Sequence, residues 1–549
     1  MTTTSTVGAL QPADVAARMA EIAKVAGRDV AKAAGLAASA KAAGLRSPLI
    51  HHLLGLELKD AGNFEGAIVE LGLGLELAPQ DAGLMTTVGL CLLELNRRHE
   101  AARIFETAMK LDPMSADALF GYGWAADRLG SLDAAQSAYG RAVALNPNHA
   151  DALAGLSGLA VRRNEWNTAR GLAERARGLD SRQTDALMNL ARVDLGEGDL
   201  EGARARLEAV IALPFLKPLA RANCRILLGD ALDGLGRYPE AIAAYTEGKT
   251  ELGDLHAGEF RDTGRPTPPE VFAAMLAEFE QAPAESWRPA SAPRTRGPER
   301  GHAFLMGFPR SGTTLLEQVI ATHPDMIALG ERPVMIDAES EFLTRAGGVT
   351  RLAGVLPDML APFRDSYWRR VRGFGIDPAG KVFVDKHPLS TMRIPLMYKM
   401  FPEAKYIFAV RDPRDVVLSC FRRSFNMNIN MYEFNTLLGA ARMYDTVMKA
   451  GEIYVSRLPI EVCQVRHEDL VADFESSARV MCDFLGVDWT PKLHDFAQTK
   501  RSIATPSGQQ IVKGLNAEGV GYWRHYAASL EPVMPILAPW IEKFGYAPD

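Results

Sequence analysis

Residues 304–316, with the sequence FLMGFPRSGTTLL, decide the fold of the second half of this chain. The apolar run from Ala303 to Met306 predicts a buried strand. A turn with two glycines follows, and the stretch from Thr313 to His323 predicts a helix that Pro324 ends. A strand, a glycine turn and a helix in this order form a cradle for phosphate, because glycines let backbone N–H groups converge on an anion and the helix N-terminus adds partial positive charge.

The residues of the turn indicate which anion it suits. Gly307 and Gly312 have the spacing of a nucleotide-triphosphate P-loop, but Thr313 occupies the position of that loop's lysine. Arg310 supplies the cation instead, and a guanidinium grips an oxyanion with two parallel hydrogen bonds. We therefore predict a site for a phosphate without a triphosphate tail. An ordinary strand–turn–helix that binds nothing is the structural alternative.

The sequence PRSGTT after an apolar strand resembles the 5′-phosphosulfate loop of sulfotransferases that use 3′-phosphoadenosine 5′-phosphosulfate (PAPS). The chain resembles most the bacterial sulfotransferases with tetratricopeptide repeats, whose catalytic half is similar to the protein-tyrosine sulfotransferases. The resemblance covers residues 301–549. It implies PAPS as sulfuryl donor, 3′,5′-ADP as product, and a cofactor-binding loop made of Pro309, Arg310, Ser311, Gly312, Thr313 and Thr314.

Composition excludes several other classes of protein. The 549 residues suffice for two or more domains, 47% are hydrophobic, and a net charge of −6 gives no general sign of nucleic-acid binding. Five dispersed cysteines predict reduced thiols, and no His/Cys/Asp cluster has the spacing of metal ligands. No apolar run has the length of a membrane span, and residues 1–8 lack the features of a signal peptide. We therefore expect a cytoplasmic, bacterial-type enzyme without a metal.

A period of 34 residues runs through residues 48–255. Small residues, an aromatic residue and a proline recur at fixed offsets, which is the tetratricopeptide pattern, and we count about six repeats. The pattern weakens where Ser181 replaces the proline, and the last repeat is displaced by four residues. The positions that keep the period are Gly55, Gly89 and Gly123; Ala67, Ala101, Ala135, Ala169 and Ala203; Phe105 and Tyr139; and Pro79, Pro113 and Pro147.

Stacked repeats form a solenoid with a concave face, which typically holds a protein or peptide partner. Docking on the chain's own catalytic domain and homodimerisation are the alternatives. Residues 1–47 are Ala-rich and predict a helical segment or degenerate first repeat. Residues 256–300 are rich in Pro and Arg and predict a linker with one helix, from Glu270 to Gln281.

Beyond the loop, short apolar strands alternate with helices. This alternation predicts an open parallel sheet with helices on both faces, so the fold class is an N-terminal α-solenoid followed by a P-loop-like α/β sulfotransferase domain at residues 301–549. Ligands of such sheets bind beyond the carboxyl ends of the strands. The predicted strands are Met326 to Leu329, Lys381 to Val384, Lys405 to Val410 and Ile460 to Val465.

A second anion site is predicted after the strand that ends at Val410. That strand delivers Arg411 to the sheet edge, and the following helix carries Ser419 and Arg423. This arrangement resembles the family's 3′-phosphate site, which PAPS needs and ATP lacks. The alternative is that Arg411 pairs only with Asp412 or Asp415.

The resemblance also assigns catalytic roles. Glu331 is implied as the general base that deprotonates the acceptor hydroxyl, a weak nucleophile that needs a positioned base. Lys386 is implied as the cation at the leaving oxygen and sulfuryl group, where negative charge develops. The structural alternatives are that Glu331 only pairs with Arg332 or caps a helix, and that Lys386 is a surface lysine paired with Asp385. His387 is the rival base, because small-molecule sulfotransferases use a histidine close after such a lysine.

A late segment resembles the part of the family that closes over the cofactor. It implies that Ser507 touches the sulfuryl end and Lys513 the 3′-phosphate side, with a surface loop as the alternative. His467 stands where protein-tyrosine members carry a tyrosine that contacts the nucleotide.

Together these features predict a PAPS-dependent sulfotransferase that acts on a hydroxyl, with protein tyrosine or another phenol favoured as acceptor. A sulfotransferase for a small molecule or glycan, and a repeat scaffold with an inactive sulfotransferase-like domain, are the alternatives. A nucleotide kinase is disfavoured because the loop lacks its lysine.

Overall fold

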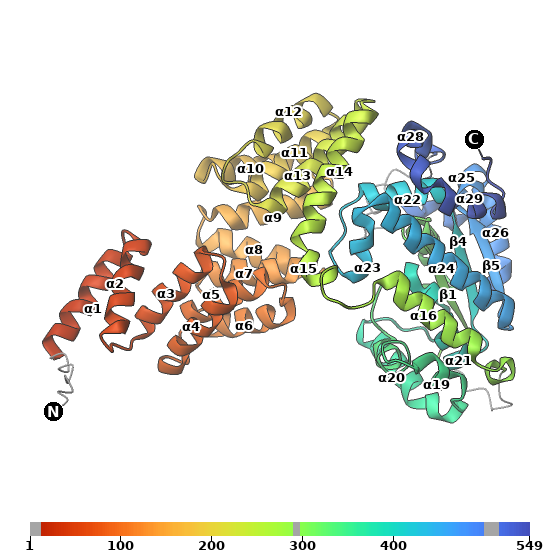
Figure 1. The fold of residues 1–549 in the computed structure, drawn as a ribbon, viewed down its shortest axis with the longest axis horizontal. Helices are drawn as coiled ribbons and strands as arrows, with labels where there is room; N and C mark the ends of the chain where they lie inside the picture. Colours follow the sequence, from red (N-terminus) through yellow and green to blue (C-terminus); the bar gives the residue numbers. More distant parts are fainter. Residues whose placement is uncertain (1–11, 289–296, 499–514, 516, 549) are drawn as a thin grey trace. The chain divides into compact units, whose positions relative to one another are not determined.

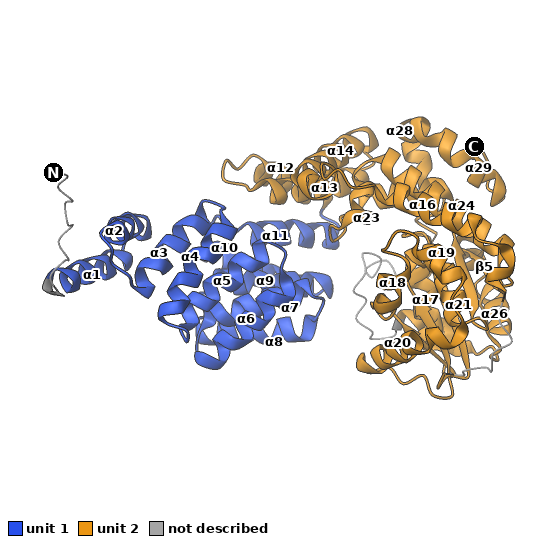
Figure 2. Ribbon diagram, turned by 60° about the horizontal axis from the view of Figure 1, so that its bottom comes forward, with its two compact units in different colours: residues 1–199 blue, residues 200–549 orange. Residues whose placement is uncertain are grey.

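The computed structural model describes residues 12–288, 297–498, 515 and 517–548, which form two compact units, residues 1–199 and 200–549 (Figure 2). The described part of the first unit is built from helices. The second unit begins with five further α-helices, α12 to α16, in its described residues and continues into a parallel sheet covered by helices (Figure 1). Within the described ranges, no helix combines the length and the apolar character that crossing a membrane requires.

Helices α3 to α14 follow the predicted repeats, with two helices for each 34-residue period, and confirm the tetratricopeptide array. An additional pair, α1 and α2, precedes them. The boundary between the units falls between α11 and α12. The helices of the array are α1 (Pro12–Ala26), α2 (Val30–Ala42), α3 (Pro48–Asp60), α4 (Phe64–Leu77), α5 (Ala82–Glu94), α6 (Arg98–Leu111), α7 (Ala116–Arg128), α8 (Leu132–Leu145), α9 (Ala150–Arg162), α10 (Trp166–Leu179), α11 (Thr184–Glu197), α12 (Leu200–Ile211), α13 (Pro218–Gly234) and α14 (Tyr238–Leu255).

The glycines that recur in the repeats leave room for the aromatic side chains that recur with them. Phe105 is fully buried, and a Cβ added to Gly89 or to Gly121 would lie 2.6 or 2.2 Å from its ring. Tyr139 stands in the same relation to Gly123, at 2.7 Å. Any larger residue at these positions would push neighbouring helices apart, which explains why small and aromatic residues recur together.

The sheet of the second unit has five parallel strands in the order β2-β3-β1-β4-β5, which confirms the predicted architecture. Leu305 pairs with Lys386, Leu329 with Asp385, and Val410 with Arg466, so the carboxyl ends of the strands lie at one edge. The strands are β1 (Gly301–Gly307), β2 (Met326–Leu329), β3 (Val382–Lys386), β4 (Lys405–Val410) and β5 (Val462–Arg466).

Helices cover both faces of this sheet, as the alternation of strands and helices predicted. Along β1, Ala303 and Leu305 belong to a core shared with α17 (Thr313–Thr322) and α26 (Phe474–Leu485), while Phe304 and Met306 face a second, larger core. The larger core includes side chains from α20 (Ala361–Gly373), α22 (Pro413–Arg422), α24 (Leu437–Arg457) and α29 (Met534–Lys543). The remaining short helices are α15 (Ala257–Phe260), α18 (Ile336–Phe342), α19 (Gly348–Ala353), α21 (Ile394–Met400), α23 (Ile429–Tyr432), α25 (His467–Ala472) and α28 (Ala527–Leu530).

Part of the segment that the sequence predicted to be a linker is packed into this core. Its helix, α16 (Pro268–Gln281), begins with a capping box between Thr267 and Glu270. The ring of Phe279 is fully buried and meets the ring of Tyr454 edge-on at 4.8 Å. The abundance of Pro and Arg around this helix suggested a solvated linker and gave no sign of these long-range contacts.

The last helix pair of the array shares the larger core and is joined to α22 and the C-terminal segment by buried polar contacts. On α13, the carboxylate of Asp233 accepts hydrogen bonds from Arg422, Tyr522 and Tyr526. On α14, the buried Lys249 donates from Nζ to the carbonyl oxygen of Arg423, 2.7 Å away. Both contacts hold α22, the helix that carries Ser419.

Replacing Asp233 by Ala should lower the stability of the second unit by about 3 kcal/mol, because it leaves a buried guanidinium without its counter-ion. The measurement is the melting temperature of the purified full-length chain. Asp254→Ala is the control, since Asp254 is exposed and lies 3.6 Å from Arg261, and it should cost less than about 0.5 kcal/mol. Equal melting temperatures of the two variants would contradict this account.

Candidate active site

The turn after β1 adopts the conformation that an anion-binding loop requires. Gly307 has φ +156°, and a Cβ there would lie 2.6 Å from the carbonyl oxygen of Ala409. Gly312 has φ +101° and begins α17, which no side chain caps in the described structure. Ser311 is turned inward and donates from Oγ to the carbonyl oxygen of Phe308 at 2.6 Å. The loop and the helix N-terminus predicted from the sequence are thus present.

Arg310 is held in a left-handed conformation, with φ +73°, which is unfavourable for a residue with a Cβ. Its Nε donates to Oγ of Ser419 on α22 at 2.9 Å. The two predicted anion sites therefore meet at Arg310 and Ser419. Backbone strain of this kind persists where the surrounding structure enforces it and is concentrated at functional sites.

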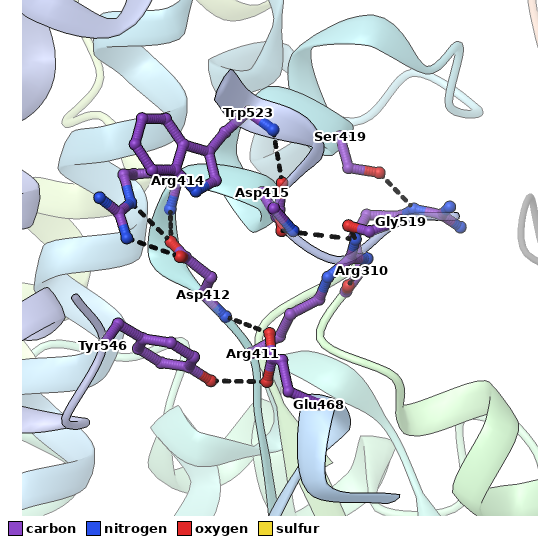
Figure 3. A network of polar contacts seen from close by, with 11 residues as sticks. Arg310, Arg411, Asp412, Arg414, Asp415, Ser419, Glu468, Gly519, Trp523 and Tyr546 are labelled. Atoms are coloured by element: carbon purple, nitrogen blue, oxygen red, sulfur yellow. Dashed lines mark hydrogen bonds and ion pairs between the residues drawn. The ribbon is translucent and has the colours of Figure 1, made fainter. Parts of the chain in front are cut away.

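Arg411 lies directly beside the loop. From the end of β4, its Nη1 donates to the carbonyl oxygen of Arg310 at 3.3 Å, and its Nη2 donates to the carbonyl oxygen of Gly519 (Figure 3). Its Nε is buried and has no hydrogen-bond partner in the residues that the structure describes. The ion pair with Asp415 is long, at 3.9 Å. Arg411 is therefore not simply paired with the acidic residues that follow it.

The neighbouring acidic residues instead hold the framework of the site. Both carboxylate oxygens of Asp412 accept hydrogen bonds from the guanidinium of Arg414, at 3.0 and 2.8 Å. The carboxylate of Asp415 accepts from the backbone N–H groups of Gly521 and Trp523, each at 2.8 Å (Figure 3). These contacts fasten the start of α22, beside the cluster formed by Arg310 and Arg411, to the C-terminal segment.

The electrostatics of the cluster favour an added anion. Burial, together with the positive charges of Arg423 and Arg411, lowers the pKa of Arg310 to about 9. His467 lies next to Gly312; burial, with Arg411 and Arg310 nearby, lowers its pKa to about 3, so its ring is neutral at pH 7. The Nδ1 atom of His467 is buried and unpartnered among the described residues. A bound phosphate would neutralise the guanidinium groups and give these polar atoms a partner.

Lys386 lies at the end of the neighbouring strand β3, and its ammonium contacts two carboxylates. Its Nζ is 2.7 Å from Oε1 of Glu331 and 2.9 Å from Oε2 of Glu317. The structure thus brings together Glu331 and Lys386, as expected, and adds Glu317 from α17. The one sign of Glu317 in the sequence is that it is the single charged residue of α17.

The pairing of Glu331 with Arg332 and the pairing of Lys386 with Asp385, which were structural alternatives, are wrong. Asp385 accepts a hydrogen bond from the hydroxyl of Tyr367 at 2.9 Å and does not pair with Lys386. The guanidinium of Arg332 lies 5.3 Å from the ring centre of Phe374, while Glu331 contacts Lys386.

His387, the rival base, follows on the same strand end. Burial of its side chain, together with the positive charges of Arg393 and Lys386, lowers its pKa to about 3. Its Nδ1 has no partner in the described residues. Such a low pKa makes His387 a weak base, whereas Glu331 has a side chain that is 40% exposed and can reach a second molecule.

Other predicted residues are placed less decisively. Arg423 follows α22, and its Nη1 lies 3.8 Å from a carboxylate oxygen of Asp230 on α13. Ser507 and Lys513 lie outside the described residues. Within the described ranges, no group of three or more His, Cys, Asp and Glu side chains has the geometry of a metal site.

Comparison with known proteins agrees with these observations. Residues 303–491 match the model of the sulfotransferase family, and residues 89–135, 126–186 and 188–253 match the model of the tetratricopeptide repeat. The first match contains the phosphate loop, Glu331, Lys386 and Arg411. The second lies within the helix pairs of the array.

Relatives are similar to less than half of this chain. An uncharacterised protein of Aquifex aeolicus (strain VF5) is 26% identical over 275 residues, which cover 48% of this chain and 36% of that protein. Protein-tyrosine sulfotransferase 1 of Danio rerio is 26% identical over 259 residues, 45% of this chain and 72% of that protein. Protein-tyrosine sulfotransferase A of Caenorhabditis elegans is 25% identical over the same length, and 67% of that protein is covered. A crystal structure of the APC/C hetero-tetramer Cut9–Hcn1 aligns with 42% of this chain and 45% of that chain at 19% identity and a TM-score of 0.36.

The strain at Arg310 leads to a stability prediction. Without ligand, Arg310→Gly should be more stable than Arg310→Ala by a few tenths to about 1 kcal/mol, because glycine adopts φ +73° without a Cβ clash but loses more entropy on folding. The melting temperatures of the two variants measure the difference. Both variants remove the same guanidinium, so their charge loss cancels in the comparison. A more stable Ala variant would show that the left-handed conformation is not strained.

Proposed function

Because residues 303–491 carry a sulfotransferase-family domain behind tetratricopeptide repeats, we propose that this protein transfers a sulfuryl group from PAPS to a hydroxyl acceptor. The observation that carries the proposal is the shared cluster of Arg310 and Arg411. Arg310 follows β1, Arg411 follows the adjacent strand β4, and Arg310 also donates a hydrogen bond to Ser419. These two cations therefore offer anion positions on both sides of one nucleotide. A triphosphate would need the missing loop lysine, whereas a nucleotide phosphorylated at two ribose positions needs two separate sites.

The residues present fit such a ligand. The 5′ side would be held by the loop at residues 309–314 and the uncapped N-terminus of α17, and the 3′-phosphate by Arg411, Ser419 and Arg423. The buried, unpartnered Nε of Arg411 and Nδ1 of His467 support this assignment, since buried polar atoms normally have hydrogen-bond partners.

Glu331 and Lys386 have separate roles in the proposed sulfuryl transfer. When bound, PAPS supplies the sulfuryl group, so that an S–O bond forms to the acceptor as the S–O bond to the 5′-phosphate breaks and 3′,5′-ADP leaves. Glu331 accepts the proton of the acceptor hydroxyl. Lys386 and Arg310 present positive charge where negative charge develops, and need no metal to do so. Fixed positions of these cations lower the barrier because the site does not have to reorganise during transfer.

The acceptor class that fits best is a phenol, including the tyrosine side chain of a protein. The named relatives are protein-tyrosine sulfotransferases, and an array of helical repeats presents a concave face that suits a peptide or protein. Small-molecule and glycan hydroxyls are the other acceptors that a labelling experiment would reveal.

Nucleotide binding is the first test of this proposal. At a concentration about 100 times its dissociation constant, 3′,5′-ADP should stabilise the protein by about 2.7 kcal/mol, seen as a higher melting temperature. Both 5′-AMP, which lacks the 3′-phosphate, and ATP with Mg²⁺ should stabilise it less. Arg411→Ala should remove the advantage of 3′,5′-ADP over 5′-AMP. Equal shifts with all three nucleotides would contradict a site built for two phosphates.

Catalysis is tested by incubating a cell lysate with ³⁵S-PAPS. The wild type should transfer label to a protein band or metabolite, and Glu331→Gln should reduce the rate by about 10²- to 10⁴-fold, because the isosteric amide cannot accept the proton. Retained stabilisation by 3′,5′-ADP would show that the variant still folds. If labelling were unchanged in Glu331→Gln but lost in His387→Asn, the base would be His387.

A further inference from the structure

Glu317 lies at the centre of the candidate site although no motif pointed to it. It is on α17, four residues after Thr313, and its Oε2 is 2.9 Å from Nζ of Lys386. Its other oxygen, Oε1, lies 3.1 Å from the position that a Cβ of Gly330 would occupy, directly before Glu331. The side chain of Glu317 therefore lies between α17, which carries it, and the end of β2.

The two carboxylates that share Lys386 differ in exposure. The side chain of Lys386 is 0% exposed, that of Glu317 is 11% exposed, and that of Glu331 is 40% exposed. Burial alone would lower the pKa of Lys386, but the two carboxylates outweigh burial and raise it. Lys386 is thus a buried ammonium with one enclosed partner and one partner that faces outward.

A single partner would conflict with catalysis by Glu331. To accept a proton from an acceptor hydroxyl, Glu331 must exchange at least part of its contact with Lys386 for a contact with the acceptor. If Lys386 had no other partner, this exchange would leave a buried, unpaired charge, which is strongly unfavourable. Asp385 cannot substitute, because its carboxylate is held by Tyr367.

We propose that Glu317 is a positioning residue, the resident counter-ion of Lys386 that fixes the ammonium and frees Glu331 to act as the base. The inference rests on the proposed function and deepens it. During transfer the proton passes from the acceptor oxygen to Glu331, while Glu317 stays ionised and Lys386 keeps its protons. Glu317 touches neither the acceptor nor the nucleotide and acts only through Lys386.

The test compares Glu317→Gln with the wild type in the full chain, using ³⁵S-PAPS and a fixed amount of lysate as acceptor. With a neutral amide at position 317, Lys386 should hold Glu331 more tightly. The maximal labelling rate should fall at least about tenfold, while the apparent KM for PAPS and the stabilisation by 3′,5′-ADP stay within about twofold. The double variant with Glu331→Gln should be no slower than Glu331→Gln alone, because both act on one proton transfer. A purely structural role would instead lower the two rates multiplicatively.

Glu70→Gln is the matched control. Glu70 lies in the first unit, is 12% exposed, and contacts Lys41 at 2.7 Å and His51 at 2.8 Å, so it is a comparable enclosed carboxylate remote from this site in sequence. Its rate should equal that of the wild type. If Glu317→Gln lost the 3′,5′-ADP shift, Glu317→Asp would replace it, with a maximal rate reduced less than about tenfold but still below the wild type.

The outcomes separate the two proposals. A Glu317 variant that binds 3′,5′-ADP and labels at the wild-type rate would overturn the role of Glu317 alone. Absence of labelling by the wild type itself would overturn the proposed function, and the role of Glu317 with it.

Discussion

Two arginine side chains of like charge, those of Arg310 and Arg411, lie near one another at the carboxyl edge of the sheet, and their contacts connect β1, β4 and α22. The side chain of Arg411 reaches the backbone of Arg310, and Arg310 in turn reaches Ser419. The positive charge of Arg411 disfavours the charged form of Arg310, and an anion bound beside them would relieve this repulsion. Together with the left-handed conformation of Arg310, this repulsion supports the proposed anion site, because strained backbone is concentrated at functional sites.

The acidic residues nearby are divided between structure and chemistry. The carboxylate of Asp412 accepts hydrogen bonds from Arg414, and that of Asp415 accepts them from backbone N–H groups of the C-terminal segment. The carboxylate of Asp233 accepts hydrogen bonds from Arg422 and two tyrosines. These contacts fix the position of α22. Glu317 and Glu331 instead contact Lys386, at the end of β3.

Local patterns were enough to predict much of this molecule. The strand, loop and helix at residues 301–322 follow from an apolar run, two glycines and a helix stop, and the repeats follow from a 34-residue period. The order of strands and helices predicted a parallel sheet, because parallel strands need helical crossovers. Because the carboxyl ends of such strands share one edge, the sequence alone predicted that Glu331, Lys386 and Arg411 lie at the same edge of the sheet.

What could not be predicted depends on contacts between distant parts of the chain. Glu317 is distinguished by its approach to Lys386, 69 positions away, and not by its neighbours in sequence. The same holds for Asp233, whose partners lie on α22 and near the C-terminus, and for α16, whose composition suggested a solvated linker. The role of Asp415 was also hidden, because its sequence position suggested an ion pair with Arg411 while its carboxylate binds the backbone of residues 521–523.

The contact between Lys249 and the end of α22 links the docking of the last helix pair to proton uptake. Burial lowers the pKa of Lys249 from 10.5 to about 7 in the folded chain, so the unfolded chain binds about one more proton at this residue between pH 7 and 10.5. This residue's contribution to stability therefore increases as pH rises through that range and is lost as pH falls toward 7. Near pH 7 this lysine is partly protonated, so the packing of α14 against the end of α22 within the second unit responds to acidity at a residue separate from Glu331 and Lys386.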